Sequence, residues 1–163
     1  EYADNGMQKM SVLPIRQGNL FFSKFVIAAL VLSAMVVIEM AVLVGCAEYW
    51  FPGYIFDLTE ILKTAGFQIV VSLPTVMLML VIASACKNMW VSLGIGVILV
   101  FTLSIFPQDN TVLSLFPFAS PYQTLAGAIE NSRTALFSVV CGIETVVFGI
   151  AEVLYLKVRR CFE

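Results

Sequence analysis

Residues 67–106 read FQIVVSLPTVMLMLVIASACKNMWVSLGIGVILVFTLSIF. Two apolar runs without a charged side chain lie on either side of one short polar break, Lys87–Asn88. A helix that crosses a bilayer needs about 20 apolar residues, with a range of about 17–25. Each run is long enough to span. The break is so short that it predicts a tight turn at a membrane surface between two antiparallel helices.

The composition of the whole chain agrees with this interpretation. Of its 163 residues, 60% are hydrophobic and 12% are charged, whereas a soluble domain is about 45–50% apolar and about 25% charged. A soluble fold of this size has too little interior to bury so much apolar surface, so lipid is the expected solvent. The net charge of −2 gives no indication of a nucleic-acid partner.

The hydropathy pattern predicts an all-α transmembrane protein, a single helical bundle over residues 1–163 with four spans. The spans are 21–46, 67–86, 89–106 and 134–156. They leave an amino-terminal segment, 1–20, two connecting segments, 47–66 and 107–133, and a carboxyl tail, 157–163.

The cations predict which side each segment occupies. Seven of the nine Lys and Arg residues lie in the amino-terminal segment, at its junction with the first span, in the 87–88 turn or in the tail; Lys63 and Arg133 lie in the other two segments. Cytoplasmic flanks carry the excess of Lys and Arg. We therefore expect both ends of the chain and the turn to be cytoplasmic, and 47–66 and 107–133 to be external.

The two external segments are not simple loops. Residues 48–63 begin with clustered aromatics, Tyr49, Trp50 and Phe51, and continue as an amphipathic helix; aromatics of this kind are enriched at membrane interfaces. Residues 116–129 are apolar but are interrupted by Pro117 and Pro121. They are too short to span, and a re-entrant or interfacial helical hairpin is expected there.

Three carboxylates fall inside predicted spans, Glu39, Glu144 and Glu152. A charge at the bilayer centre costs roughly 2.5–3.5 kcal/mol on insertion scales, so such groups usually face protein or water. Glu39 is either a cavity-lining acid for a cationic substrate or a hydrogen-bonded contact between helices. Glu144 has no partner visible in the sequence.

A stripe of small residues runs along the last span. Gly142, Thr145, Gly149 and Glu152 share one face of a helix, and small residues allow a second helix to approach closely. A packing or ion-pair role near the inner surface is expected for Glu152. In the second span, Pro74 is expected to kink the helix, with Ser72 or Thr75 satisfying the freed backbone.

Several classes of site are excluded or disfavoured. The chain has no histidine, which excludes His-based triads and HExxH metal sites. Its four cysteines form no CxxC pair, and buried single thiols are the simpler interpretation than disulfides or metal ligands. No Walker A sequence and no nucleophile–base set is present. We expect no catalytic residue, no metal and no bound cofactor.

The amino-terminal stretch EYADNGMQKMSVLPIRQGNLFFSKF, residues 1–25, resembles the first cytoplasmic loop of ABC-2 type ABC transporter permeases. In that family the loop begins with Glu and an aromatic, passes through a Leu-Pro stretch and ends at a Lys that opens the next span. SLFPFASPYQTL, residues 114–125, is similar to the external segment before the last span in the lantibiotic-immunity branch.

The resemblance implies a partnership and a coupling segment. ATP and Mg²⁺ would be bound by a separate ATP-binding subunit, and a second permease chain, identical or similar, would face this one. The first loop would be a coupling helix docked on the ATPase. Its residues here would be Glu1, Tyr2, Met7, Met10, Leu13, Pro14 and Arg16. A helix lying on lipid is the alternative for this segment. The family has six spans, so we expect spans three to six here and the first two missing.

The function implied is export from the bacterial cytoplasmic membrane, with an amphipathic substrate and, for the immunity branch, a lantibiotic. The expected substrate path comprises Glu39, Tyr49, Trp50, Phe51, Phe116, Phe118 and Tyr122. Two alternatives remain open: a membrane scaffold or sensor that transports nothing, and an intramembrane enzyme, for which the sequence offers no catalytic set.

Overall fold

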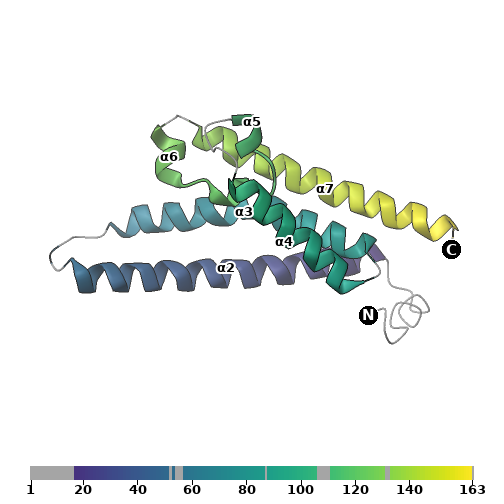
Figure 1. Ribbon diagram of the computed structural model, residues 1–163, viewed down its shortest axis with the longest axis horizontal. Helices are drawn as coiled ribbons and strands as arrows, with labels where there is room; N and C mark the ends of the chain where they lie inside the picture. The colour runs from purple at the N-terminus through teal and green to yellow at the C-terminus, as the bar shows by residue number, and fades with distance from the viewer. Residues whose placement is uncertain are drawn as a thin grey trace.

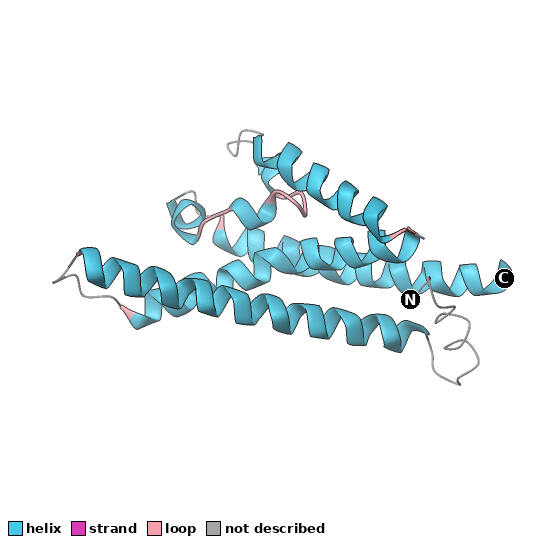
Figure 2. Ribbon diagram, turned by 60° about the horizontal axis from the view of Figure 1, so that its bottom comes forward, coloured by secondary structure: helices cyan, strands magenta, loops and turns pink. Residues whose placement is uncertain are grey.

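The computed structural model describes residues 17–51, 53, 57–86, 88–105, 111–130 and 133–162 (Figure 1). Over these residues the protein is helical and has no strand (Figure 2), which confirms the all-α prediction. The elements are α2 (Gln17–Trp50), α3 (Leu58–Ala85), α4 (Met89–Ile105), α5 (Thr111–Ser114), the 3₁₀ turn η1 (Ser120–Tyr122), α6 (Leu125–Glu130) and α7 (Thr134–Phe162).

Local capping explains where two of the helices begin. The Asp57 carboxylate accepts a hydrogen bond from the backbone N–H of Thr59 at 2.9 Å, and Glu60 lies in the first turn of α3, where a negative charge is favoured by the helix dipole. The Asn88 side chain accepts from the N–H of Trp90 at 3.0 Å and so starts α4. The predicted turn at 87–88 lies between these helices, with Lys87 itself outside the described residues.

Among the described residues, three helices are long and apolar enough to cross a membrane. These candidate spans are Gly18–Trp50, Leu58–Ala85 and Thr134–Val158, and they correspond to the predicted spans 21–46, 67–86 and 134–156, the second of which was predicted to end one residue later. The remaining predicted span, 89–106, is represented by α4, a shorter apolar helix of 17 residues. At a rise of 1.5 Å per residue α4 is about 26 Å long, slightly less than the roughly 30 Å of hydrocarbon.

α3 is the central helix. It contacts α2, α4, η1, α6 and α7, and its contact with α7 is the most extensive. α2 and α3 run side by side in opposite directions, and the end of α2 and the start of α3 lie at the end of the bundle opposite the end of α7 (Figure 1). The start of α2, the α3–α4 turn and the end of α7 lie at the same end of the bundle. This is the grouping of ends that the distribution of cations predicted.

Two buried clusters hold the bundle together. The first joins α3, α6 and α7 through Phe67, Val71, Ala128, Phe137 and Cys141. The second joins α4 to the segment after α5 through Leu103, Phe118 and Ala119, with α3 side chains packed against it. Elsewhere the helices expose large apolar side chains along their length, most of all on α2. These faces are suited to hydrocarbon, where apolar exposure carries no penalty.

Glycines allow α4 and α7 to approach α3. A Cβ added to Gly96 of α4 would lie 2.5 Å from the Cε of Met79, and one added to Gly149 of α7 would lie 3.2 Å from the Cε of Met77. Each methionine of α3 therefore occupies the space that a side chain on the neighbouring helix would need. This is the small-residue packing expected between helices in lipid, and it includes Gly149 of the predicted stripe.

Candidate functional site

The segment between α5 and α6 is attached to the middle of α3 by hydrogen bonds. The Gln68 amide donates to the carbonyl of Pro121 at 2.8 Å, and the Thr75 hydroxyl donates to the carbonyl of Pro117. In the opposite direction, the Ser120 hydroxyl donates to the carbonyl of Val71 at 2.9 Å. The predicted re-entrant region is thus a set of short helical pieces lying against α3.

Pro74 lies in the part of α3 that contacts the segment. Proline has no N–H for the carbonyl four residues earlier, here that of Val70. The carbonyl that accepts from Ser120 is that of the next residue, Val71. The sequence predicted that Ser72 or Thr75 would satisfy the freed backbone of α3; the Thr75 hydroxyl instead bonds the neighbouring segment.

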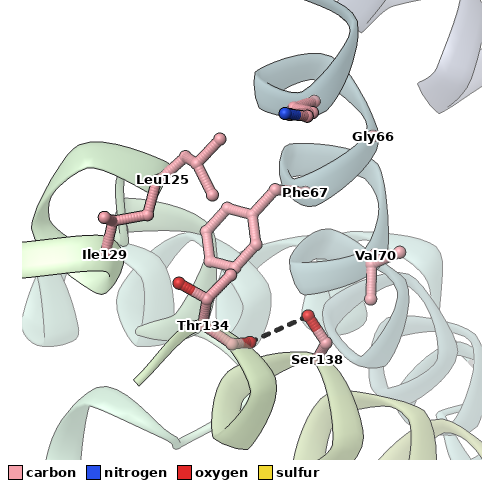
Figure 3. Close-up of a pocket in the computed structure, with 8 residues that line it drawn as sticks. Gly66, Phe67, Val70, Leu125, Ile129, Thr134 and Ser138 are labelled. Atoms are coloured by element: carbon pink, nitrogen blue, oxygen red, sulfur yellow. Dashed lines mark hydrogen bonds between the residues drawn. The ribbon is translucent and has the colours of Figure 1, made fainter. Parts of the chain in front are cut away.

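A pocket of about 380 Å³ lies beside this attachment, between α3, α6 and α7. Figure 3 shows Phe67 pointing toward Leu125 and Ile129 of α6, with Thr134 and Ser138 of α7 on the opposite side. The Ser138 hydroxyl donates to the backbone carbonyl of Thr134 at 2.9 Å. The remaining lining residues are Lys63, Gly66 and Val70.

The lining of the pocket is mostly apolar. Its walls are apolar apart from two hydroxyls and the exposed Lys63. No group of three or more His, Cys, Asp or Glu residues that could hold a metal occurs among the described residues. An apolar pocket with few polar groups is typical of a site for a hydrophobic ligand group.

The predicted substrate-path residues do not meet in one cavity. Glu39 is exposed on α2, and Tyr49, Trp50 and Phe51 are exposed at its far end. Phe116 and Tyr122 are partly exposed on the attached segment, whereas Phe118 is 1% exposed and packs with Leu103. In this conformation Phe118 is part of the core and is not on a surface that a substrate can reach.

The predicted packing stripe on α7 is split between different surroundings. Glu152 is 1% exposed and accepts a hydrogen bond from the Ser84 hydroxyl of α3. Gly149 faces Met77, whereas a Cβ added to Gly142 would meet nothing within 4 Å. The Thr145 hydroxyl donates to the carbonyl of Cys141 in its own helix at 2.8 Å. The half of the stripe nearer the end of α7 therefore contacts α3.

Two other sets of predicted residues are Glu144 and the coupling residues. Glu144 is half-buried on α7, and its Oε2 atom is buried without a hydrogen-bond partner among the described residues. The coupling residues Glu1, Tyr2, Met7, Met10, Leu13, Pro14 and Arg16 lie outside the described residues. Of the predicted coupling segment, 1–20, only the beginning of α2 is described.

Sequence reasoning did not identify the pocket of Figure 3. Its lining residues occur in pairs four apart, such as Lys63 with Phe67 and Leu125 with Ile129, and this spacing places each pair on one helix face. The spacing is visible in the sequence. The meeting of faces from three helices is not, because it depends on how the segment after α5 packs against α3.

The chain was compared with known protein families. The sequence model described as "ABC-2 family transporter protein" matches residues 1–103. The chain belongs to the ABC-2 transporter family. Among curated proteins and solved structures, none matches it. The family match covers α2, α3 and most of α4, together with the sixteen residues before α2. This ABC-2 protein is therefore a membrane permease component of a transporter, and the family does not itself contain the ATPase.

Proposed function

We propose that the chain is the membrane-spanning subunit of an ABC-2 exporter, driven by ATP hydrolysis on a separate subunit. The observation that carries the proposal is the family match over residues 1–103, which begins with the predicted coupling segment and continues through α2 and α3. The bundle supports it, because the start of α2, the α3–α4 turn and the end of α7 lie at one end, where a cytoplasmic subunit can reach all three.

The proposed mechanism uses α2 and α3 as the moving elements. The coupling segment, residues 1–16, would be moved when the ATP-binding subunits close, and α2 follows it directly along the chain. α3 contacts α2, α4 and α7, so a displacement of α2 would reach α4 and α7 through it. Two permease chains would face each other and alternate between inward and outward access.

We propose further that the substrate is an amphipathic cationic peptide of the lantibiotic type, expelled from a bacterial cytoplasmic membrane. Support comes from Glu39, an exposed carboxylate within the apolar middle of α2, residues 25–47, because an acid inside a span is usually functional. The exposed aromatics at the far end of α2 would hold the peptide at the interface. The apolar pocket of Figure 3 would receive one of its hydrophobic side chains.

The coupling assignment is tested by co-purification. The double variant Met7→Asp, Met10→Asp is expected to lose at least about tenfold in recovered ATP-binding subunit, because each charge would have to be desolvated in an apolar interface. The matched control is Leu58→Asp, Leu62→Asp, which adds two acids to exposed positions at the opposite end of the bundle. Equal recovery of the ATPase with both double variants would contradict the assignment.

The substrate assignment is tested in cells that express the complete transporter. Glu39→Gln is expected to lower the protection against a cationic lantibiotic by about fivefold or more, because it removes a charged contact with the peptide inside the membrane span. Glu48→Gln, at an exposed position near the end of the same helix, is the control for loss of one negative charge. Unchanged protection with Glu39→Gln would remove this residue from the path.

A further inference from the structure

A second groove lies between α2 and α7 at the end of the bundle that holds the carboxyl terminus. It has a volume of about 410 Å³, within the usual range for small-molecule sites. Phe21 and Phe25 of α2 form one wall, Gly149 and Val153 of α7 form the other, and Met77 of α3 lies at the bottom. The two helices are close at its outer end, where a Cβ added to Gly18 would lie 3.8 Å from Val153.

The length of the groove matches one leaflet of a bilayer. Its lining on α7 extends from Thr145 to Leu154, which is about 14 Å at a rise of 1.5 Å per residue. Half of the hydrocarbon core is about 15 Å thick. Both helices belong to the candidate spans, and the lining of the groove is apolar apart from the Thr145 hydroxyl, so its natural contents are apolar chains.

A cation lies at the headgroup end of this groove. Lys157 follows Val153 by one helical turn and lies on the same face of α7, and its side chain is exposed. Side chains of a helix point back toward its amino terminus, which for Lys157 is the direction of the groove. The first turn of α2, on the other wall, contains no acidic residue. The end of the groove therefore attracts a negative charge.

From this juxtaposition we propose that the groove between α2 and α7 binds one acyl chain of an anionic phospholipid, whose phosphate contacts Lys157. The apolar walls select a hydrocarbon chain, and the lysine selects a headgroup with net negative charge. The proposal does not depend on the substrate or on the ATP-binding subunit. A lysine near a membrane surface favours anionic over zwitterionic lipid by about fivefold.

The test measures lipid retained by the purified full-length chain in native mass spectrometry. Dioleoyl phosphatidylglycerol and dioleoyl phosphatidylcholine are added separately at equal concentration. The wild-type chain is expected to retain phosphatidylglycerol about fivefold more strongly, and Lys157→Gln is expected to remove this preference. Lys24→Gln is the matched control, because Lys24 is an exposed cation of α2 that lies beside the inner part of the groove, near Phe25, and not at its outer end by Gly18 and Val153.

A second pair of variants tests the acyl-chain part of the site. Gly18 lines the groove, and a Cβ added there makes ordinary contact with Val153, so Gly18→Leu is expected to lower the retention of both lipids. Gly45→Leu, on the same helix with nothing within 4 Å, is expected to change neither.

Four outcomes would overturn the proposal. Equal retention of the two lipids by the wild-type chain would show that no anionic headgroup is recognised. An equal loss with Lys24→Gln and Lys157→Gln would show only a general effect of surface charge. Dimer dissociation by Gly18→Leu with unchanged lipid retention would assign the groove to a second copy of the chain, and increased retention after removal of residues 1–16 would assign it to that segment.

Discussion

Replacing Ser120 by alanine should loosen the attachment of the segment between α5 and α6. Ser120 is fully buried, and its hydroxyl donates to the carbonyls of Val71 at 2.9 Å and Pro117 at 3.1 Å. Alanine is nearly isosteric, so the change removes the hydrogen bond to α3 without creating a large cavity. A hydrogen bond between elements of a membrane protein contributes about 0.6 kcal/mol on average and up to about 1.7 kcal/mol.

If the lost hydrogen bond contributes about 1 kcal/mol, the equilibrium constant for local opening of the segment should rise about fivefold, since 1.4 kcal/mol is a factor of ten. Hydrogen exchange of the reconstituted chain measures this directly. The reporting amides are those of Ala119, Ser120, Tyr122 and Gln123, which donate to carbonyls within the segment at 2.8–3.1 Å. They should exchange about five times faster in Ser120→Ala, while amides in the centre of α7 keep their rates.

Ser104→Ala is the matched control, because the Ser104 hydroxyl bonds only the Phe101 carbonyl of its own helix, at 2.8 Å. Adding Thr75→Val to Ser120→Ala removes a second bond to the segment and should bring the total acceleration to about 25-fold if the two contributions add. If Ser120→Ala accelerates exchange no more than Ser104→Ala, the hydrogen bonds to α3 do not hold the segment.

The packing of α3 gives two further predictions. Glu152→Ala should lower the free energy of unfolding by about 1–3 kcal/mol, because a buried hydrogen bond to Ser84 is lost. The loss is measured as a lower melting temperature of the detergent-solubilised chain. Glu152→Gln keeps an acceptor there and should have a melting temperature closer to that of the wild type. Gly96→Leu should be destabilising, since its side chain meets Met79, whereas Gly94→Leu enters open space and should be nearly neutral. Similar melting temperatures for the two leucine variants would contradict the close packing of α4 on α3.

The sequence predicted those features that depend on one helix at a time. The long helices were predicted from the apolar runs, because lipid requires long uninterrupted helices. The turn was predicted from the short break at Lys87–Asn88, and the non-spanning segment from the interruptions at Pro117 and Pro121. The lengths were less accurate, since α2 extends from Gln17 to Trp50 whereas its predicted span covered only the apolar part.

The sequence did not predict how elements distant in the chain combine. Ser120 and Val71 are 49 residues apart, and nothing in either neighbourhood indicates that they meet. Phe118 was assigned to the substrate path because it is aromatic and external, but a residue of that type is equally suited to a buried cluster, and the structure places it in one. Such alternatives are decided by packing against α3.

The length of α2 has a mechanical consequence. Its 34 residues form a rod about 51 Å long, and even at a tilt of about 40°, the upper end of the usual range, it would cover about 39 Å along the membrane normal. The hydrocarbon is only about 30 Å thick, so the rod must emerge into the polar layer on at least one side. If one projecting end of α2 is displaced parallel to the membrane, the helix can tilt within the bilayer. Its other end, which carries Tyr49 and Trp50, then moves in the opposite direction.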